Sequence, residues 1–113
     1  MNILLINCNQ FLKKELKEFV GRKVANIFST ASALKAINIL DHNSIDMVLL
    51  RMNTISDVAL LNYINNNYKK TKVLLSAERD LEDVISSIKD GEYTILRDQD
   101  NLAEINKYFQ SKS

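Results

Sequence analysis

The stretch IDMVLLRMNT, residues 45–54, decides the fold of this 113-residue chain. The apolar residues 47–50 do not alternate with polar ones, and the run ends abruptly at Arg51. A short apolar run of this kind is typical of a strand buried on both faces, as in a parallel sheet covered by helices. Such folds place their chemistry at the carboxyl ends of the strands, so the residue at position 51 matters most for function.

The other apolar runs of the chain alternate with amphipathic stretches. Strands are therefore predicted at residues 3–6, 24–28, 47–50, 72–75 and 93–96, with a helix after each. Strands that alternate with helices imply right-handed crossovers and a parallel sheet with helices on both faces. With five such units, we expect an α/β fold, a flavodoxin-like (βα)5 doubly wound parallel sheet with strand order 2-1-3-4-5.

Four of the predicted helices have an expected N-cap. An asparagine within residues 7–9 precedes the first helix, and Asp80 precedes the fourth. Ser29 is the expected N-cap of the second helix, and Asp57 is the expected cap of the third. The residues expected to face the core are Ala33, Leu34, Ile37 and Leu40 in the second helix, and Val58, Leu61, Ile64 and Tyr68 in the third.

The composition is that of an ordinary globular protein, with 46% hydrophobic and 26% charged residues, and we expect a single domain over residues 1–113. The net charge of +1 gives no field across the whole molecule that favours nucleic acid or a membrane surface, and we expect neither as a direct partner, although this balance does not exclude a local basic patch. No apolar run approaches the roughly 18 residues of a membrane span. The single cysteine, Cys8, excludes an internal disulfide, and a reducing cytoplasm is the expected setting.

In the expected strand order, the carboxyl ends of strands one, three, four and five surround one crevice. The residues at those ends are Asn7, Cys8, Arg51, Ser76 and Arg97. In one interpretation Arg51, Arg97 and Ser76 bind an anion, either phosphate or a carboxylate. In the other, which we favour, Arg51 extends into solvent or pairs with Glu78 or Asp98.

Cys8 and His42 are further candidates for chemistry. Nearby cations favour a thiolate at Cys8, which would suit a redox sensor, but we favour a partly buried, inert thiol at a strand end. His42 has no second histidine or cysteine near it in sequence, so we expect a solvated loop residue. The sequence offers no base–nucleophile pair and no metal cluster, so neither an enzyme nor a cofactor is expected.

Five short segments along the chain form a recognisable series: AL at 33–34, VLLRM at 48–52, LLSA at 74–77, KDG at 89–91 and ILRD at 95–98. In this order they resemble a response-regulator receiver (CheY-like) domain, over nearly the full length of the chain. VLLRM is similar to the stretch around the family's phosphorylated aspartate, and LLSA to its fourth-strand motif ending in Thr/Ser-Ala. AL is similar to the second-helix signature, KDG to the run before strand five, and ILRD to the segment ending in Lys-Pro.

The positions that the resemblance marks as catalytic depart from the family one by one. Asn7 and Cys8 occupy the places of its acidic pair, Arg51 that of its phospho-acceptor aspartate and Arg97 that of its lysine. Only the hydroxyl position is kept, as Ser76. A guanidinium cannot serve as the carboxylate nucleophile, and Mg²⁺ requires hard oxygen ligands. We therefore expect no Mg²⁺-dependent phosphotransfer; instead, Arg51 could replace the metal's charge and hydrogen-bond Asn7 and nearby carbonyls.

Three functions follow from the resemblance with these departures. The first is a pseudo-receiver of two-component-type signalling that acts without phosphorylation. Its face of helix four, strand five and helix five, with Tyr93 and Tyr108, would bind a protein partner or a second copy. The second is the regulatory domain of an atypical response-regulator transcription factor, whose DNA-binding domain is not in this chain. The third is an anion or small-ligand sensor at the crevice around Arg51.

Overall fold

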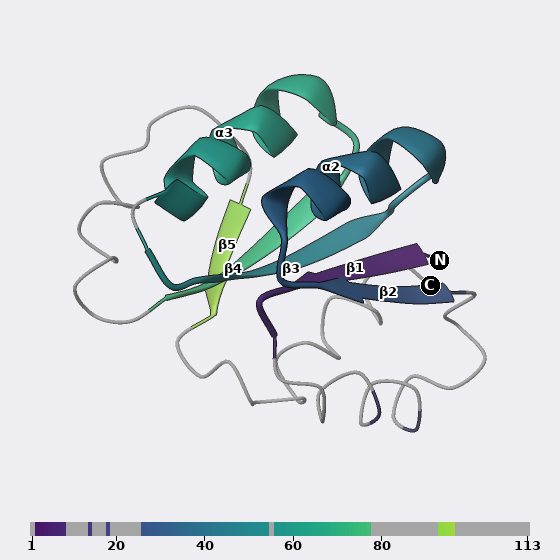
Figure 1. The fold of residues 1–113 in the computed structure, drawn as a ribbon, viewed down its shortest axis with the longest axis horizontal. Coiled ribbons are helices and arrows are strands. Elements are labelled where there is room, and N and C mark those ends of the chain that lie inside the picture. Colours follow the sequence, from purple (N-terminus) through teal and green to yellow (C-terminus); the bar gives the residue numbers. More distant parts are fainter. Residues whose placement is uncertain are drawn as a thin grey trace.

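The computed structural model describes residues 2–8, 14, 18, 26–54, 56–77 and 93–96. Its centre is a five-stranded sheet in the order β2-β1-β3-β4-β5, in which every neighbouring pair is parallel (Figure 1). This order confirms the predicted flavodoxin-like topology. The elements are β1 (Asn2–Ile6), β2 (Asn26–Thr30), α2 (Ala33–His42), β3 (Met47–Met52), α3 (Ser56–Asn67), β4 (Lys72–Ala77) and β5 (Tyr93–Leu96).

The central strand β3 is buried on both faces, as its sequence predicts. Residues 47–50 are each 3% exposed or less. Alternate residues of β3 pack against α2 and α3, which lie together on one face of the sheet (Figure 1). The cluster on that face contains Leu4, Ile6, Val48, Leu50, Met52, Val73 and Leu75 from the strands, and Ala36, Leu40, Leu60, Leu61 and Ile64 from the helices.

The second strand lies two residues later than predicted, at Asn26–Thr30 instead of 24–28. The strand is at the edge of the sheet, where exposed polar residues such as Ser29 are tolerated. The prediction of Ser29 as a helix cap is therefore wrong. The N-cap of α2 is Ser32, whose hydroxyl accepts a hydrogen bond from the backbone N–H of Lys35 at 3.3 Å.

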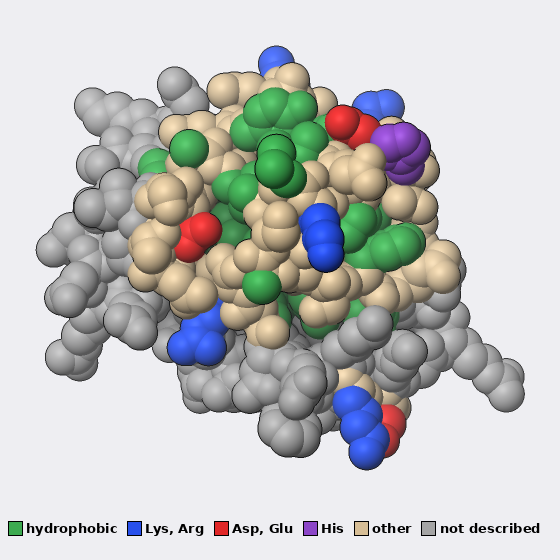
Figure 2. Space-filling view, in the orientation of Figure 1, with side chains coloured by type: hydrophobic (Ala, Val, Ile, Leu, Met, Phe, Trp, Pro, Cys, Tyr) green, Lys and Arg blue, Asp and Glu red, His purple; other side chains and the backbone are tan. Residues whose placement is uncertain are grey.

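The predicted core stripe of α2 is wrong at its start. Leu34 is 81% exposed, whereas Ala36 and Leu40 are buried. With the helix beginning at residue 33, Leu34 lies roughly 200° around the axis from Ala36 and so on the outer side. Figure 2 shows hydrophobic side chains gathered on the surface over α2 and α3.

Asp57 acts at the start of α3, but from inside its first turn and not from before it. Its carboxylate accepts hydrogen bonds from the backbone N–H groups of Asn53 and Thr54, at 2.8 and 3.0 Å. These bonds fix the loop that leaves the carboxyl end of β3.

The first, fourth and fifth predicted helices lie outside the described residues, apart from Lys14 and Glu18 in the first, which are helical and exposed. Within the part of the chain that the structure describes, no helix has the length and apolar character needed to span a membrane.

Candidate functional site at the carboxyl edge of the sheet

Three of the five predicted site residues lie in one row at the carboxyl edge of the sheet. Arg51 of β3 pairs directly with Ser76 of β4. Asn7 follows the last residue of β1, and its side chain reaches β3 by a hydrogen bond. Residues paired across parallel strands point to the same side of the sheet. Arg51 and Ser76 therefore share the face opposite α2 and α3, as neighbours.

Asn7, at the end of β1, forms hydrogen bonds with residues of β2 and β3 and so links three strands. Its φ of 61° lies in the left-handed region, which asparagine tolerates better than most residues. Its backbone N–H donates to the carbonyl of Thr30 at 2.9 Å, and its side-chain Nδ2 donates to the carbonyl of Arg51 at 3.1 Å. The predicted link between Asn7 and Arg51 thus exists through the Arg51 main chain, and no hydrogen bond joins the guanidinium to Asn7.

Cys8 packs next to the same edge, with its thiol against main-chain carbonyls. Its Sγ lies 3.5 Å from the carbonyl oxygen of Ile6 and 3.6 Å from that of Leu49. A thiol can donate to a carbonyl, whereas a thiolate cannot, so these contacts suit a protonated sulfur.

Arg51 and Ser76 differ in burial. Ser76 is only 7% exposed, and Arg51 is half-buried. Arg97, the third member of the predicted anion-binding set, lies outside the described residues, as do Glu78, Asp98 and Tyr108. The backbone of Tyr93 begins β5, but its side chain is also outside the description.

The donor atoms in this row do not suit Mg²⁺. The side chains at this edge are an amide, a thiol, a guanidinium and a hydroxyl, and none of them is the carboxylate through which proteins usually bind Mg²⁺. The first carboxylate after β3 in the chain, Asp57, is already bound to two backbone N–H groups. Among the described residues, no group of three His, Cys, Asp or Glu side chains could hold a metal ion.

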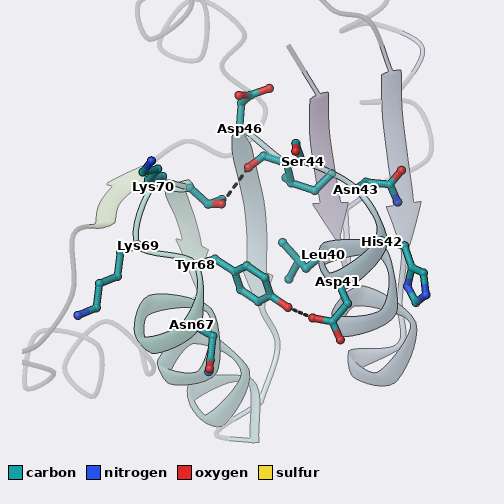
Figure 3. A pocket seen from close by; sticks show the side chains of 12 residues that line it. Leu40, Asp41, His42, Asn43, Ser44, Asp46, Asn67, Tyr68, Lys69 and Lys70 are labelled. Atoms are coloured by element: carbon teal, nitrogen blue, oxygen red, sulfur yellow. Dashed lines mark hydrogen bonds between the residues drawn. The ribbon is translucent and has the colours of Figure 1, made fainter.

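A second polar site, which the sequence did not reveal, lies between the C-terminal ends of α2 and α3. It is a hollow of about 620 Å³ (Figure 3). The hydroxyl of Tyr68 donates to the carboxylate of Asp41 across it, and Thr71 Oγ1 donates to the carbonyl of Ile45 at 2.8 Å. The Asp41 carboxylate, by accepting this hydrogen bond, raises the pKa of Tyr68 well above its ordinary value.

His42 lies beside this hollow at the last residue of α2, and not in a loop as predicted. Its ring Nδ1 is 2.8 Å from the carbonyl oxygen of Asn38, one turn earlier. The ring is exposed, and His42 is among the residues that line the hollow (Figure 3). The prediction of an exposed histidine is therefore confirmed, although the residue lies at the end of a helix and not in a loop.

Comparison of the sequence with protein-family models and with curated proteins gives no match. Comparison of the structure with solved structures gives four matching chains, two of which are response-regulator chains with the following similarity. The response regulator TrrA from Thermotoga maritima, in complex with Mg²⁺–BeF, has a TM-score of 0.68 at 20% identity, covering 97% of this chain and 96% of its own. The N-terminal signal receiver domain of a two-component response regulator from Bacteroides fragilis has a TM-score of 0.65 at 19% identity, covering 91% and 90%. This chain has the CheY-like fold of response-regulator receiver domains.

Proposed function

We propose that this chain is a receiver-like module of two-component-type signalling that acts by binding protein, without being phosphorylated. The observation that carries the proposal is Arg51 at the carboxyl end of the central strand, paired with Ser76. Phosphoryl transfer to an acceptor there would need a carboxylate nucleophile, and a guanidinium is permanently protonated and not nucleophilic.

The side chains next to Arg51 support the same proposal. The Asn7 amide is committed to a main-chain carbonyl, and the Cys8 thiol packs against two others. The TrrA structure is a complex with Mg²⁺–BeF, which is a property of that protein. In this chain the positive charge of Arg51 would oppose the binding of a divalent ion at the carboxyl edge of the sheet.

The proposed binding face is formed by the fourth helix, the fifth strand and the fifth helix, with Tyr93 and Tyr108. This face would bind a protein partner or a second copy of the chain, and it would bind neither a membrane nor nucleic acid. Support comes from the position of β5 at the edge of the sheet, where Tyr93 is its first residue. The single cysteine supports a cytoplasmic setting. The transcription-factor alternative stays a prediction.

A titration with Mg²⁺ and beryllofluoride, followed by ¹H–¹⁵N spectra, tests the proposal without needing the partner. We expect no saturable shifts at the carboxyl edge of the sheet. The matched control is the triple variant Asn7→Asp, Cys8→Asp and Arg51→Asp, which supplies three carboxylates at the same positions and should gain a response. Saturable shifts in the wild type that require both ions would contradict the proposal.

Specific geometry at this edge also favours a second candidate, a sensor for small oxyanions. The hydroxyl of Ser76 is on a nearly buried residue and has no hydrogen bond within the described part of the chain. Its cross-strand neighbour Arg51 also has no side-chain hydrogen bond or ion pair there. A guanidinium beside a hydroxyl is suited to phosphate or a carboxylate.

The two oxyanions can be compared directly by titration with inorganic phosphate and with acetate at constant ionic strength. The sensor requires saturable shifts at residues 51 and 76 that Arg51→Met abolishes. The exposed Lys35→Met is the matched control, because it removes a cation on the other side of the sheet. Shifts that persist in Arg51→Met would exclude this candidate.

A further inference from the structure

Two neighbouring side chains at the carboxyl edge of the sheet have unused hydrogen-bonding capacity. Arg51 and Ser76 are paired across β3 and β4, and neither side chain has a hydrogen-bond partner within the described part of the chain. Ser76 is 7% exposed and Arg51 is half-buried. A buried polar group without a partner costs free energy, so a ligand that supplies acceptors to both side chains would be stabilised there.

The amide donors around this pair already have acceptors. The backbone N–H and the side-chain Nδ2 of Asn7 both donate to main-chain carbonyls. In the loop after β3, the backbone N–H groups of Asn53 and Thr54 both donate to the carboxylate of Asp57. Phosphate sites in proteins commonly depend on several backbone N–H groups that point at the ligand. These four donors would have to give up existing hydrogen bonds to serve in this way.

The side-chain donors that remain at the carboxyl ends of β3 and β4 are the Arg51 guanidinium and the Ser76 hydroxyl. A guanidinium presents two parallel N–H groups in one plane, which match the two oxygens of a carboxylate. The hydroxyl can donate one further hydrogen bond to either oxygen. These donors satisfy both oxygens of a carboxylate, whereas a phosphate group has further oxygens that they leave without a partner.

The charge at this edge favours the same class of ligand. Among the described residues at the carboxyl ends of the strands, Arg51 is the one cationic side chain. The single negative charge of a carboxylate is balanced by Arg51. A phosphate group carries about 1.5 to 2 negative charges at pH 7, so part of its charge would be uncompensated next to the nearly buried Ser76.

We propose that Arg51 and Ser76 bind a carboxylate, with the guanidinium on both oxygens and the hydroxyl on one of them. This carboxylate site rests on the oxyanion-sensor candidate and specifies its ligand. A free small acid and an acidic side chain of a protein partner present the same binding group, so the test includes both sources.

Titrations with sodium acetate and with sodium phosphate at pH 7 and constant ionic strength, followed in ¹H–¹⁵N spectra, give the two dissociation constants. We expect acetate to bind at least about fivefold more tightly than phosphate, because its charge is balanced. Arg51→Lys keeps the charge and removes the planar pair of N–H groups, so it should weaken acetate binding roughly 10-fold. Ser76→Ala removes the hydroxyl and should weaken it roughly threefold or more.

The source of the carboxylate is tested by a parallel titration with the α-amide of N-acetyl-aspartic acid. Tighter binding of this compound than of acetate assigns the site to an acidic side chain of a protein, and the reverse order assigns it to a free acid. The ¹H–¹⁵N spectrum of each variant also shows whether the sheet is folded.

Three results would overturn the carboxylate site. If phosphate binds as tightly as acetate or more tightly, and Arg51→Met abolishes its binding, the ligand class is wrong while the oxyanion sensor stands. If neither anion gives saturable shifts, both the carboxylate site and the oxyanion sensor are excluded. Acetate binding that is unchanged in Arg51→Lys would show that any cation suffices at this position.

Discussion

Replacing Tyr68 with Phe removes the hydroxyl that joins the end of α3 to α2 and leaves the ring in place. The ring packs against the core cluster, so the variant creates no cavity there. A hydrogen bond to a charged group contributes roughly 1.5–3 kcal/mol when buried. The Tyr68–Asp41 pair is exposed, so we take a smaller value of about 1 kcal/mol. For a domain of this size, that loss lowers the thermal midpoint by about 4 °C.

The pH dependence gives this prediction a second readout. The Asp41 carboxylate raises the pKa of folded Tyr68 above the ordinary value of 10.0, so the folded protein retains this proton more strongly than the unfolded chain. The contribution is therefore fully present below pH 10 and is lost as the pH rises above it. The difference in stability between the wild type and Tyr68→Phe should shrink accordingly.

Urea denaturation of four proteins measures both effects: the wild type, Tyr68→Phe, Asp41→Ala and the double variant. With Asp41 replaced, Tyr68→Phe should cost almost nothing, because the acceptor is gone. The reasoning is refuted if Tyr68→Phe is as stable as the wild type at pH 7. It is also refuted if the stability difference between them grows above pH 10.

Substitutions at four further positions test the fold by stability at pH 7. Leu50 is 1% exposed, so Leu50→Ala should lower the free energy of unfolding by about 3 kcal/mol through lost burial and a cavity. Leu34 is 81% exposed, so Leu34→Ala should lower it by less than about 0.5 kcal/mol. Equal losses in the two variants would contradict the assigned burial. Ser32→Ala removes the N-cap of α2 and should cost about 1 kcal/mol, and an unchanged urea midpoint would argue against the cap. Asn7→Ala should lower the free energy of unfolding by about 2 kcal/mol, because alanine disfavours the left-handed backbone and the hydrogen bond to β3 is lost. Asn7→Gly should lower it by less, because glycine adopts this backbone conformation readily. A larger loss for Asn7→Gly than for Asn7→Ala would exclude backbone strain at Asn7.

The sheet could be predicted from sequence because its central strands have an unambiguous signal. Residues 47–50 are apolar without alternation, and both of their faces are buried. The signal weakens at β2, where an edge strand accepts exposed polar residues, and the predicted range was displaced by two residues. Leu34 was misplaced because an apolar residue near a helix start does not fix the phase of the helix until its cap, Ser32, is known.

The proximity of Arg51 and Ser76 in the candidate site could also be predicted from the sequence. Arg51 and Ser76 meet because the carboxyl ends of neighbouring parallel strands must meet. The details depend on tertiary geometry that no local pattern encodes. Asn7 reaches the main chain of Arg51 because of its left-handed backbone. The pair of Asp41 and Tyr68 joins residues 27 apart, each of which is an ordinary helix-end residue by sequence.

The phosphorylation reaction itself gives the most direct measurement. The wild-type chain is incubated with acetyl phosphate and Mg²⁺, and its intact mass is then determined. A receiver domain that has the family's acceptor aspartate and acidic pair is treated in the same way as a control. Because the central strand ends at Arg51 and not at a carboxylate, we expect the mass to stay unchanged while the comparison domain gains one phosphoryl group. A Mg²⁺-dependent adduct on this chain that hydroxylamine removes would show an acyl phosphate and contradict the proposal.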